Sequence, residues 1–236
     1  MKLSVEDPLA VAVVKAIHDG DVGGLQRLLA ENPGLATAAI GPRTLLHIAT
    51  DWPGHFPGVA ATVAALIAAG ADVNARFTGR HTETPLHWAA STDDVAALDA
   101  LLDAGADLDA PGAVIGGGTP LADAVAFGQW KAARRLVERG ARTTLWQAAA
   151  LGLADRVEEH FAGATPPTPD EVNNALWCAC HGGQRVTAEY LLSRGADLNW
   201  MGHDGLTPTD AARRSGAEQL VSWLSARGGK SAKDLS

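Results

Sequence analysis

The 236-residue sequence lacks any cluster of basic residues. Its 19 Lys and Arg residues are outnumbered by 27 Asp and Glu residues, which gives a formal charge of −8. Proteins hold nucleic-acid phosphates through clustered Lys and Arg, whereas the pairs Arg134-Arg135 and Arg213-Arg214 have acidic residues nearby. The sequence therefore argues against nucleic acid and against an anionic membrane surface as partners.

Cysteine is nearly absent, since Cys178 and Cys180 are the only two. Two residues apart on a predicted helix, their side chains diverge and do not readily form a disulfide. The same divergence argues against a metal site built on these cysteines and His181, because no second pair completes four ligands. We predict no metal and no cofactor.

Long apolar runs are missing as well. Glu6 and Asp7 interrupt the start of the chain, so it does not have the pattern of a secretory signal. The apolar stretch at 9–14 ends at Lys15 and is too short to span a bilayer. We expect a cytoplasmic protein that does not enter the membrane.

Aromatic residues other than tryptophan are rare, with one Tyr and four Phe beside seven Trp. Ala, Leu and Val dominate the apolar residues, which suits closely packed small helices with a few large rings placed for another purpose. Nor does the sequence contain a nucleophile elbow, a P-loop or a dinucleotide-binding fingerprint.

Two short phrases recur in register along the chain. A phrase beginning Gly-Ala starts at Gly70, Gly105, Gly140 and Gly195. Fourteen residues after the first two glycines stand Thr84-Pro85-Leu86-His87-Trp88-Ala89 and Thr119-Pro120-Leu121-Ala122-Asp123-Ala124, with weaker copies at 44–49 and 207–212. Proline fits the first turn of a helix and glycine fits the residue after one, so the phrases predict the start and end of repeated helix pairs.

The phrases resemble the Thr-Pro-Leu-His-x-Ala signature and 33-residue period of ankyrin repeats over about residues 10 to 228. The resemblance implies an all-α solenoid of six or seven helix-turn-helix units with β-hairpin-like fingers. We place one solenoid at 1–228 and a flexible tail at 229–236. The units are expected near 11–40, 42–77, 84–111, 119–143, 145–163, 169–199 and 207–227.

The family likeness also assigns roles to single positions. His47 and His87 stand at the signature histidine, which ties its turn to the neighbouring units. Trp146 and Trp177 fall at the same place in their units and are interpreted as large packing substitutes where this histidine network is abandoned. The next position faces the groove in ankyrin-like stacks and is predicted to hold Ile48, Trp88, Asp123, Gln147 and Cys178. One turn further along follow Asp51, Ser91, Ala126, Ala150 and His181.

Two loops depart from a simple repeat. The segment 51–58 contains two prolines and two glycines, together with Asp51, Trp52 and His55. It either lines a site or plugs the end of the stack. The finger Pro111–Gly118 is glycine-rich and apolar at its tip, so it is either a lid over the groove or a loose hairpin.

The first functional hypothesis is a noncatalytic module that binds a protein partner through the groove and fingers. The acidic charge favours a partner with a basic or mixed surface. Among the finger residues, charge reversal at Arg76 and Arg80 should weaken such binding.

The alternative is a site for a small, partly apolar ligand, or a cofactor-independent enzyme that transfers a proton or adds water. Aromatic walls with a few converging polar groups favour a ligand pocket, and here the walls would be Trp52, Trp88 and Trp130, with the Gln147 amide. The candidate acid and base groups are Asp51, His55, Asp123 and His181. In that case Asp123→Asn and His181→Ala should abolish turnover and leave the melting temperature nearly unchanged.

Overall fold

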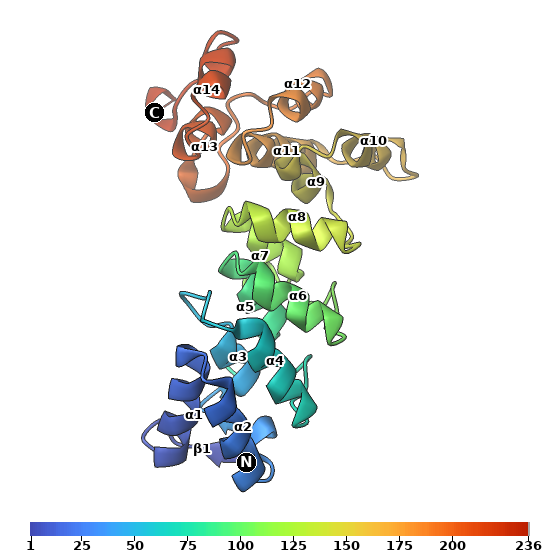
Figure 1. Cartoon of the computed structure of the whole chain (residues 1–236). Coiled ribbons are helices and arrows are strands. Elements are labelled where there is room, and N and C mark those ends of the chain that lie inside the picture. Colours follow the sequence, from blue (N-terminus) through green and yellow to red (C-terminus); the bar gives the residue numbers. More distant parts are fainter. Residues whose placement is uncertain (236) are drawn as a thin grey trace. The chain divides into compact units, whose positions relative to one another are not determined.

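The computed structural model describes residues 1–235 and divides the chain into two compact units, Met1–Ala141 and Arg142–Ser236. Both units consist of successive helix pairs (Figure 1). The boundary falls in the connection from Gly140 to Thr144, where the sequence is too short for a finger.

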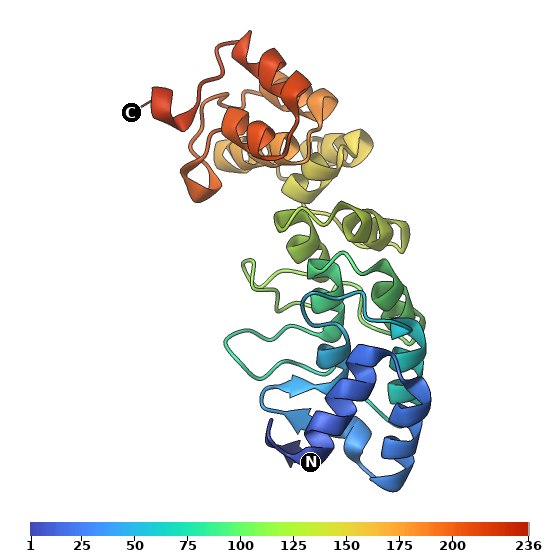
Figure 2. The same cartoon turned by 60° about the vertical axis from the view of Figure 1, so that its left-hand side comes forward.

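In the first unit, a short N-terminal segment precedes four helix pairs, and the connections at 70–84 and 105–119 extend from the same side of the unit (Figure 2). Its elements are β1 (Lys2–Leu3), α1 (Pro8–Asp19), α2 (Val22–Glu31), η1 (Leu35–Thr37), β2 (Ala39–Ile40), β3 (Arg43–Thr44), α3 (Leu45–Ala49), α4 (Val59–Ala68), α5 (Pro85–Ser91), α6 (Val95–Asp103), α7 (Pro120–Ala126) and α8 (Trp130–Glu138). The strand order is β1-β2-β3, with β1 parallel to β2 and β2 antiparallel to β3.

The second unit holds three helix pairs and a C-terminal turn. Its elements are α9 (Leu145–Leu151), α10 (Ala154–Ala162), α11 (Pro169–His181), α12 (Arg185–Ser193), η2 (His203–Gly205), α13 (Pro208–Arg214), α14 (Glu218–Ser225) and η3 (Ala232–Asp234).

The recurring phrases form the helix ends for local reasons. Proline begins α5, α7 and α13, where a missing N–H breaks no helical hydrogen bond, and the threonine before each proline is the N-cap. After the second helix of four pairs, a glycine takes a left-handed φ between 90° and 100°, which a side chain would resist; these are Gly70, Gly105, Gly140 and Gly195.

Small side chains allow the helices of neighbouring pairs to pack closely. Ala89, Ala90 and Ala124 are fully buried, and leucines such as Leu86 and Leu121 fill the remaining space. Because one helix pair has too little apolar surface to form a core alone, each pair relies on its neighbours for burial.

The signature histidines tie one repeat to the next. His47 bonds the Thr44 hydroxyl through Nδ1 at 2.8 Å and the Glu83 carbonyl through Nε2 at 3.1 Å. His87 repeats this arrangement with Thr84 and with the carbonyl of Gly118. Both imidazoles are fully buried, and burial lowers the pKa of each to about 4.

Trp177 takes the histidine position in the second unit, as the sequence predicts, but the prediction that the link between repeats is abandoned there is wrong. Its indole N–H donates to the carbonyl of Leu206 at 2.9 Å. Leu206 directly precedes the capping Thr207, as Glu83 directly precedes Thr84, so the tryptophan makes the same link between repeats.

The prediction for Trp146 is wrong, because Gln147 takes the histidine position in α9. The Gln147 side chain accepts the N–H of Thr144 at 2.8 Å and completes a capping box. The left-handed Gly152 follows α9 directly, whereas Thr92 stands between α5 and the left-handed Asp93. The span from the N-cap to the left-handed residue is therefore one residue shorter in this repeat, at 144–152 against 84–93, which displaces positions counted back from the left-handed residue.

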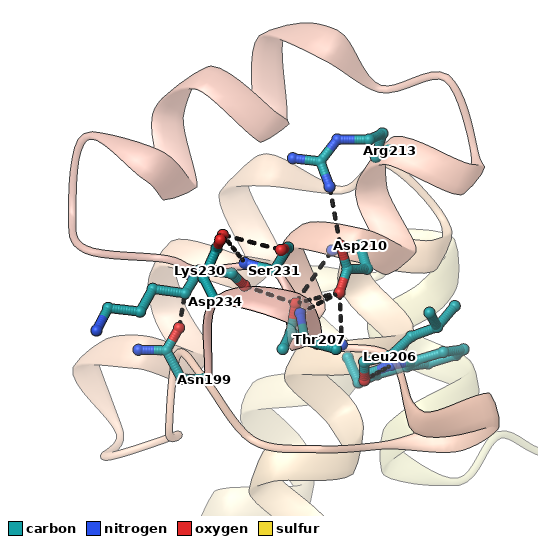
Figure 3. A network of polar contacts seen from close by, with 10 residues as sticks. Asn199, Leu206, Thr207, Asp210, Arg213, Lys230, Ser231 and Asp234 are labelled. Atoms are coloured by element: carbon teal, nitrogen blue, oxygen red, sulfur yellow. Dashed lines mark hydrogen bonds and ion pairs between the residues drawn. The ribbon is translucent and has the colours of Figure 1, made fainter. Parts of the chain in front are cut away.

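The C-terminal segment lies against the last helix pair (Figure 3). Thr207 donates its hydroxyl to the carbonyl of Lys230 at 2.7 Å, and the N–H of Ala232 donates to the Asp210 carboxylate at 2.7 Å. Ser231 and Asp234 cap the short η3 turn. Residues 230–234 of the tail predicted as flexible at 229–236 thus have hydrogen-bond partners, and Ser236 lies outside the described residues.

Asp210 connects this segment to the repeat. Burial by itself would raise the pKa of Asp210, but hydrogen bonds from Ala232 and Thr207 outweigh it and hold the pKa below its ordinary value. The same carboxylate also accepts from Arg213 at 2.8 Å, in an ion pair whose arginine is half exposed.

We predict that Asp210→Ala releases the C-terminal segment. A hydrogen bond to a charged acceptor contributes about 1.5–3 kcal/mol, so the amide of Ala232 should exchange about ten- to a hundredfold faster. Hydrogen exchange measured by NMR checks this. Arg213→Ala is the control, because it removes only the solvent-exposed ion pair; equal exchange rates in the two variants would contradict the role given to Asp210.

Candidate functional site

A hollow of about 500 Å³ opens on the first unit. Three consecutive repeats contribute to it through the loop after α3, the fingers before α5 and α7, helix α5, and the turn between α7 and α8. We call it the aromatic hollow. Its lining residues are Thr50, Asp51, Trp52, His81, Glu83, Trp88, Ser91, Thr92, Val114, Phe127 and Gln129.

Apolar side chains in this hollow are open to solvent to an unusual degree. Trp52 is 79% exposed, Val114 55% and Phe127 48%. Trp88 is half-buried, with its ring centroid 4.9 Å from that of His47 and 5.4 Å from that of Phe77. The Trp88 ring is therefore held by packing, while Trp52 and Phe127 have surface to cover.

Glu83 lies in the wall of the hollow although only 5% of it is exposed. One carboxylate oxygen accepts the indole N–H of Trp88 at 2.8 Å, and the other accepts the backbone N–H of Val114 at 2.8 Å. His81 Nδ1 lies 3.1 Å from the carboxylate. These partners offset the desolvation of a buried carboxylate and also attach the finger 111–118 to α5.

Asp123 lies beside Glu83 and is completely buried. Burial, followed by the charge of Glu83 and a hydrogen bond with it, raises the pKa of Asp123 to about 8. Neither Asp123 oxygen has a hydrogen bond of ordinary geometry, so the contact between the carboxyls is loose and burial is the main cause. At neutral pH Asp123 therefore retains its proton, and the charge of the pair resides on Glu83.

The predicted site residues within the first unit have different surroundings. Asp51, Trp52 and Trp88 line the hollow. Asp51 forms an ion pair with Arg43 at 2.5 Å. The prediction that Asp123 faces an open groove is wrong, since its neighbours cover it completely. Trp130 begins α8 and is not among the lining residues.

His55 has a linking role in the loop 51–58. Its backbone N–H donates to Asp94 at 2.7 Å, and its Nε2 lies 3.0 Å from the carbonyl of Thr92. Gly54 has a φ of 74° and lies so close to Thr92 that a Cβ would clash at 2.8 Å. The start of the loop thus lines the hollow, and its second half attaches to the following repeat.

The remaining predicted residues belong to the second unit. Gln147 is 3% exposed and caps α9, so the prediction that its amide faces a groove is wrong. His181 ends α11, where its ring lies 5.6 Å from Trp177 and its Nδ1 lies 3.3 Å from the hydroxyl of Ser215.

Two other expected groove positions are buried. Ile48 is 1% exposed and Cys178 4%, which contradicts the predicted groove-facing placement. Cys180 is buried as well, and burial raises the pKa of both thiols, that of Cys180 to about 12, which disfavours the thiolate that binds metals. Within residues 1–235 no cluster of three potential metal-binding side chains occurs.

Sequence reasoning missed Glu83 and His81, which lie in the finger before α5. One available signal was an acid directly in front of the Thr84-Pro85 phrase, where a carboxylate next to a buried turn needs a partner. The role of Glu83 depends on its hydrogen bond with Val114, which lies 31 residues further along the chain. No spacing rule predicts that contact.

Comparisons with known proteins concern the repeats. A family model described as ankyrin repeats in three copies matches residues 58–145, and a single ankyrin-repeat model matches 173–202. The crystal structure of the human ASB11 ankyrin repeat domain superposes with a TM-score of 0.55 at 23% identity, covering 90% of this chain and 96% of that one. Among curated proteins no match was found. No helix within residues 1–235 has the length and apolar character needed to cross a bilayer.

Proposed function

Because the chain belongs to the ankyrin-repeat family, we propose that it is a noncatalytic binding module that docks a protein partner on the aromatic hollow of its first unit. Ankyrin repeats are generally protein-interaction modules, and stacked repeats present extended surfaces for this purpose. The proposal includes the cytoplasmic location expected from the sequence, where the buried thiols of Cys178 and Cys180 stay reduced.

The observation that carries the proposal is the exposed apolar surface around the hollow. Trp52, Val114 and Phe127 each leave about half or more of their surface in water, and they come from the loop after α3, the finger before α7 and the turn after α7. A group of exposed large apolar residues is typical of an interaction surface. Tryptophan is also among the residues that contribute most when a partner covers them.

The two arginines of the finger before α5 differ in their contacts. Arg76 donates to the carbonyls of Thr82 and Pro111, so reversing its charge would disturb two neighbouring fingers as well as any binding. Arg80 lies on the same finger and is exposed. Arg80→Glu is therefore the cleaner test of finger binding.

We predict that Trp52→Ala weakens partner binding about tenfold or more, since truncating a central tryptophan commonly costs about 2 kcal/mol. The intact chain is immobilised, a retained partner is purified, and its affinity is then measured by calorimetry. Val186→Ala is the matched control, because Val186 is 75% exposed but lies in the second unit. Equal affinities of the two variants would place the partner elsewhere and refute the proposal.

A further inference from the structure

The charged groups in the aromatic hollow have one dominant sign. Its lining includes the carboxylates of Asp51 and Glu83 and contains no lysine or arginine. Asp51 is already paired with Arg43, whereas the partners of Glu83 are the neutral N–H groups of Trp88 and Val114 and the ring of His81. No lysine or arginine therefore pairs with Glu83, and its contact with His81 is an ion pair only when His81 is protonated.

The aromatic rings of the hollow add a second attraction for positive charge. An aromatic face attracts a cation, and tryptophan does so most strongly. The Trp88 indole donates its N–H to Glu83, an arrangement that leaves electron density on the ring. Trp52 and Phe127 line the same hollow and expose large parts of their surfaces.

From this combination of carboxylates and aromatic rings, we propose that the aromatic hollow receives a positively charged side chain, arginine or lysine, from the docked segment of the protein partner. The inference rests on the proposed function and specifies the chemistry of the partner. The formal charge of −8 on the whole chain favours the approach of such a segment.

Other occupants fit less well on physical grounds. An acidic side chain would meet two carboxylates with no lysine or arginine in the lining to pair with it. A purely apolar side chain would cover the rings, but it would add no attraction for the carboxylates of Asp51 and Glu83. A cation gains from the rings and the carboxylate together.

Asp123, the buried neighbour of Glu83, does not add a second negative charge to this preference. Burial and the proximity of Glu83 raise the pKa of Asp123 to about 8, so Asp123 is neutral at pH 7. Glu83 consequently has a neutral carboxylic acid next to it. A single positive charge in the hollow is sufficient to balance Glu83.

A direct test uses two probes of nearly equal shape. Nα-acetyl-arginine amide is titrated into the intact chain, and the indole N–H signals of Trp52 and Trp88 are followed by NMR at pH 7. Nα-acetyl-citrulline amide is the neutral comparison. A cation–aromatic contact contributes about 1 kcal/mol at an exposed site, so we expect about fivefold tighter binding of the arginine derivative. Equal binding of the two probes would overturn the inference.

Variants of the protein identify the residues that cause the preference for the arginine derivative. Glu83→Gln should remove the preference for the arginine derivative, while Glu31→Gln makes the same charge change on the exposed end of α2 and should leave the preference intact. If Glu83→Gln does not fold, Trp52→Ala provides the second variant, because its exposed side chain contributes little to the core. An unchanged preference in the folded variants would place the cation outside the hollow and overturn the inference.

The same experiments separate this inference from the proposed function. If Trp52→Ala weakens binding of the purified partner, but neutralising each arginine and lysine of the bound segment has no effect, the docking surface stands and the cation is rejected. If Trp52→Ala leaves partner binding unchanged, the docking proposal itself fails, whatever the small probes do.

Discussion

Replacing Asp123 with asparagine makes the protein more stable, by about 2–4 kcal/mol near pH 8. The folded chain buries this carboxyl completely beside Glu83, which raises its pKa from 3.8 to about 8. An amide of similar shape has no proton to lose. The variant therefore avoids the free-energy cost that the carboxyl incurs as the pH rises.

The sign of the pH dependence follows from proton binding. Between pH 3.8 and about 8 the folded state holds the Asp123 proton while the unfolded chain has released it. Stability from this group is therefore complete at low pH and is lost as the pH rises through 8. Because Asp123 and Glu83 interact, the decline belongs to the pair.

Urea unfolding at pH 7, 7.5 and 8 measures this effect, because the two buried histidines contribute little change above pH 7. The wild-type midpoint should fall across the series, and that of Asp123→Asn should stay nearly level. Asp103→Asn is the control, since Asp103 is exposed and its pair with Arg139 contributes little. Parallel declines in the wild type and Asp123→Asn would contradict the assigned proton. The outcome also differs from the sequence-based expectation that Asp123→Asn leaves the melting temperature nearly unchanged.

Mild acid should destabilise the protein, because it charges two histidines that the fold keeps neutral. Burial lowers the pKa of His47 and of His87 from 6.5 to about 4. Between pH 4 and 6.5 both histidines are protonated in the unfolded chain and neutral in the folded chain. Stability is therefore lost as the pH falls from about 6.5 toward 4, by at most about 3 kcal/mol for each histidine.

The chain itself suggests the variant that tests this prediction. Gln147 caps Thr144 in the position that His87 occupies at Thr84, so glutamine can form the cap without titrating. The double variant His47→Gln, His87→Gln should lose much less stability than the wild type between pH 6.5 and 4. Thermal melts across this range measure the loss. An undiminished loss in a folded double variant would assign the acid sensitivity to other groups.

Asp210 and Asp123 do not obscure this window. The pKa of Asp210 lies below its ordinary value, so its contribution is lost only below about pH 4. Asp123 acts in the opposite direction, with stability falling as the pH rises. Together the histidines and Asp123 predict a stability maximum near pH 6.5.

Sequence reasoning succeeded where the role of a residue depends on its neighbours in the sequence. The Thr-Pro phrases begin α5, α7 and α13, and the repeated glycines follow the second helices. Trp177 could be identified as a replacement for histidine because its position relative to the repeated phrases is regular. Its indole N–H makes a link to the next repeat that the sequence did not predict.

The same reasoning failed where the repeat spacing changes. Helix α9 is followed directly by its left-handed glycine, so counting from the end of the helix assigned Trp146 to a position that Gln147 occupies. Sequence reasoning also missed the partners of the tail, for which Thr207 and Asp210 form hydrogen bonds. A linear count of residues contains neither the changed spacing nor these contacts.

The amino-acid sequence by itself determined the helix pairs, their caps and the family, because these depend on residues a few positions apart. Only the tertiary structure decided which polar groups meet. Glu83 joins Val114 and Asp123 across the repeats, while predicted residues such as Ile48 and Asp123 become buried. The physical reason is that burial and side-chain direction are set by neighbours 30 to 40 residues away, so exposure and charge at the hollow arise only when the repeats stack.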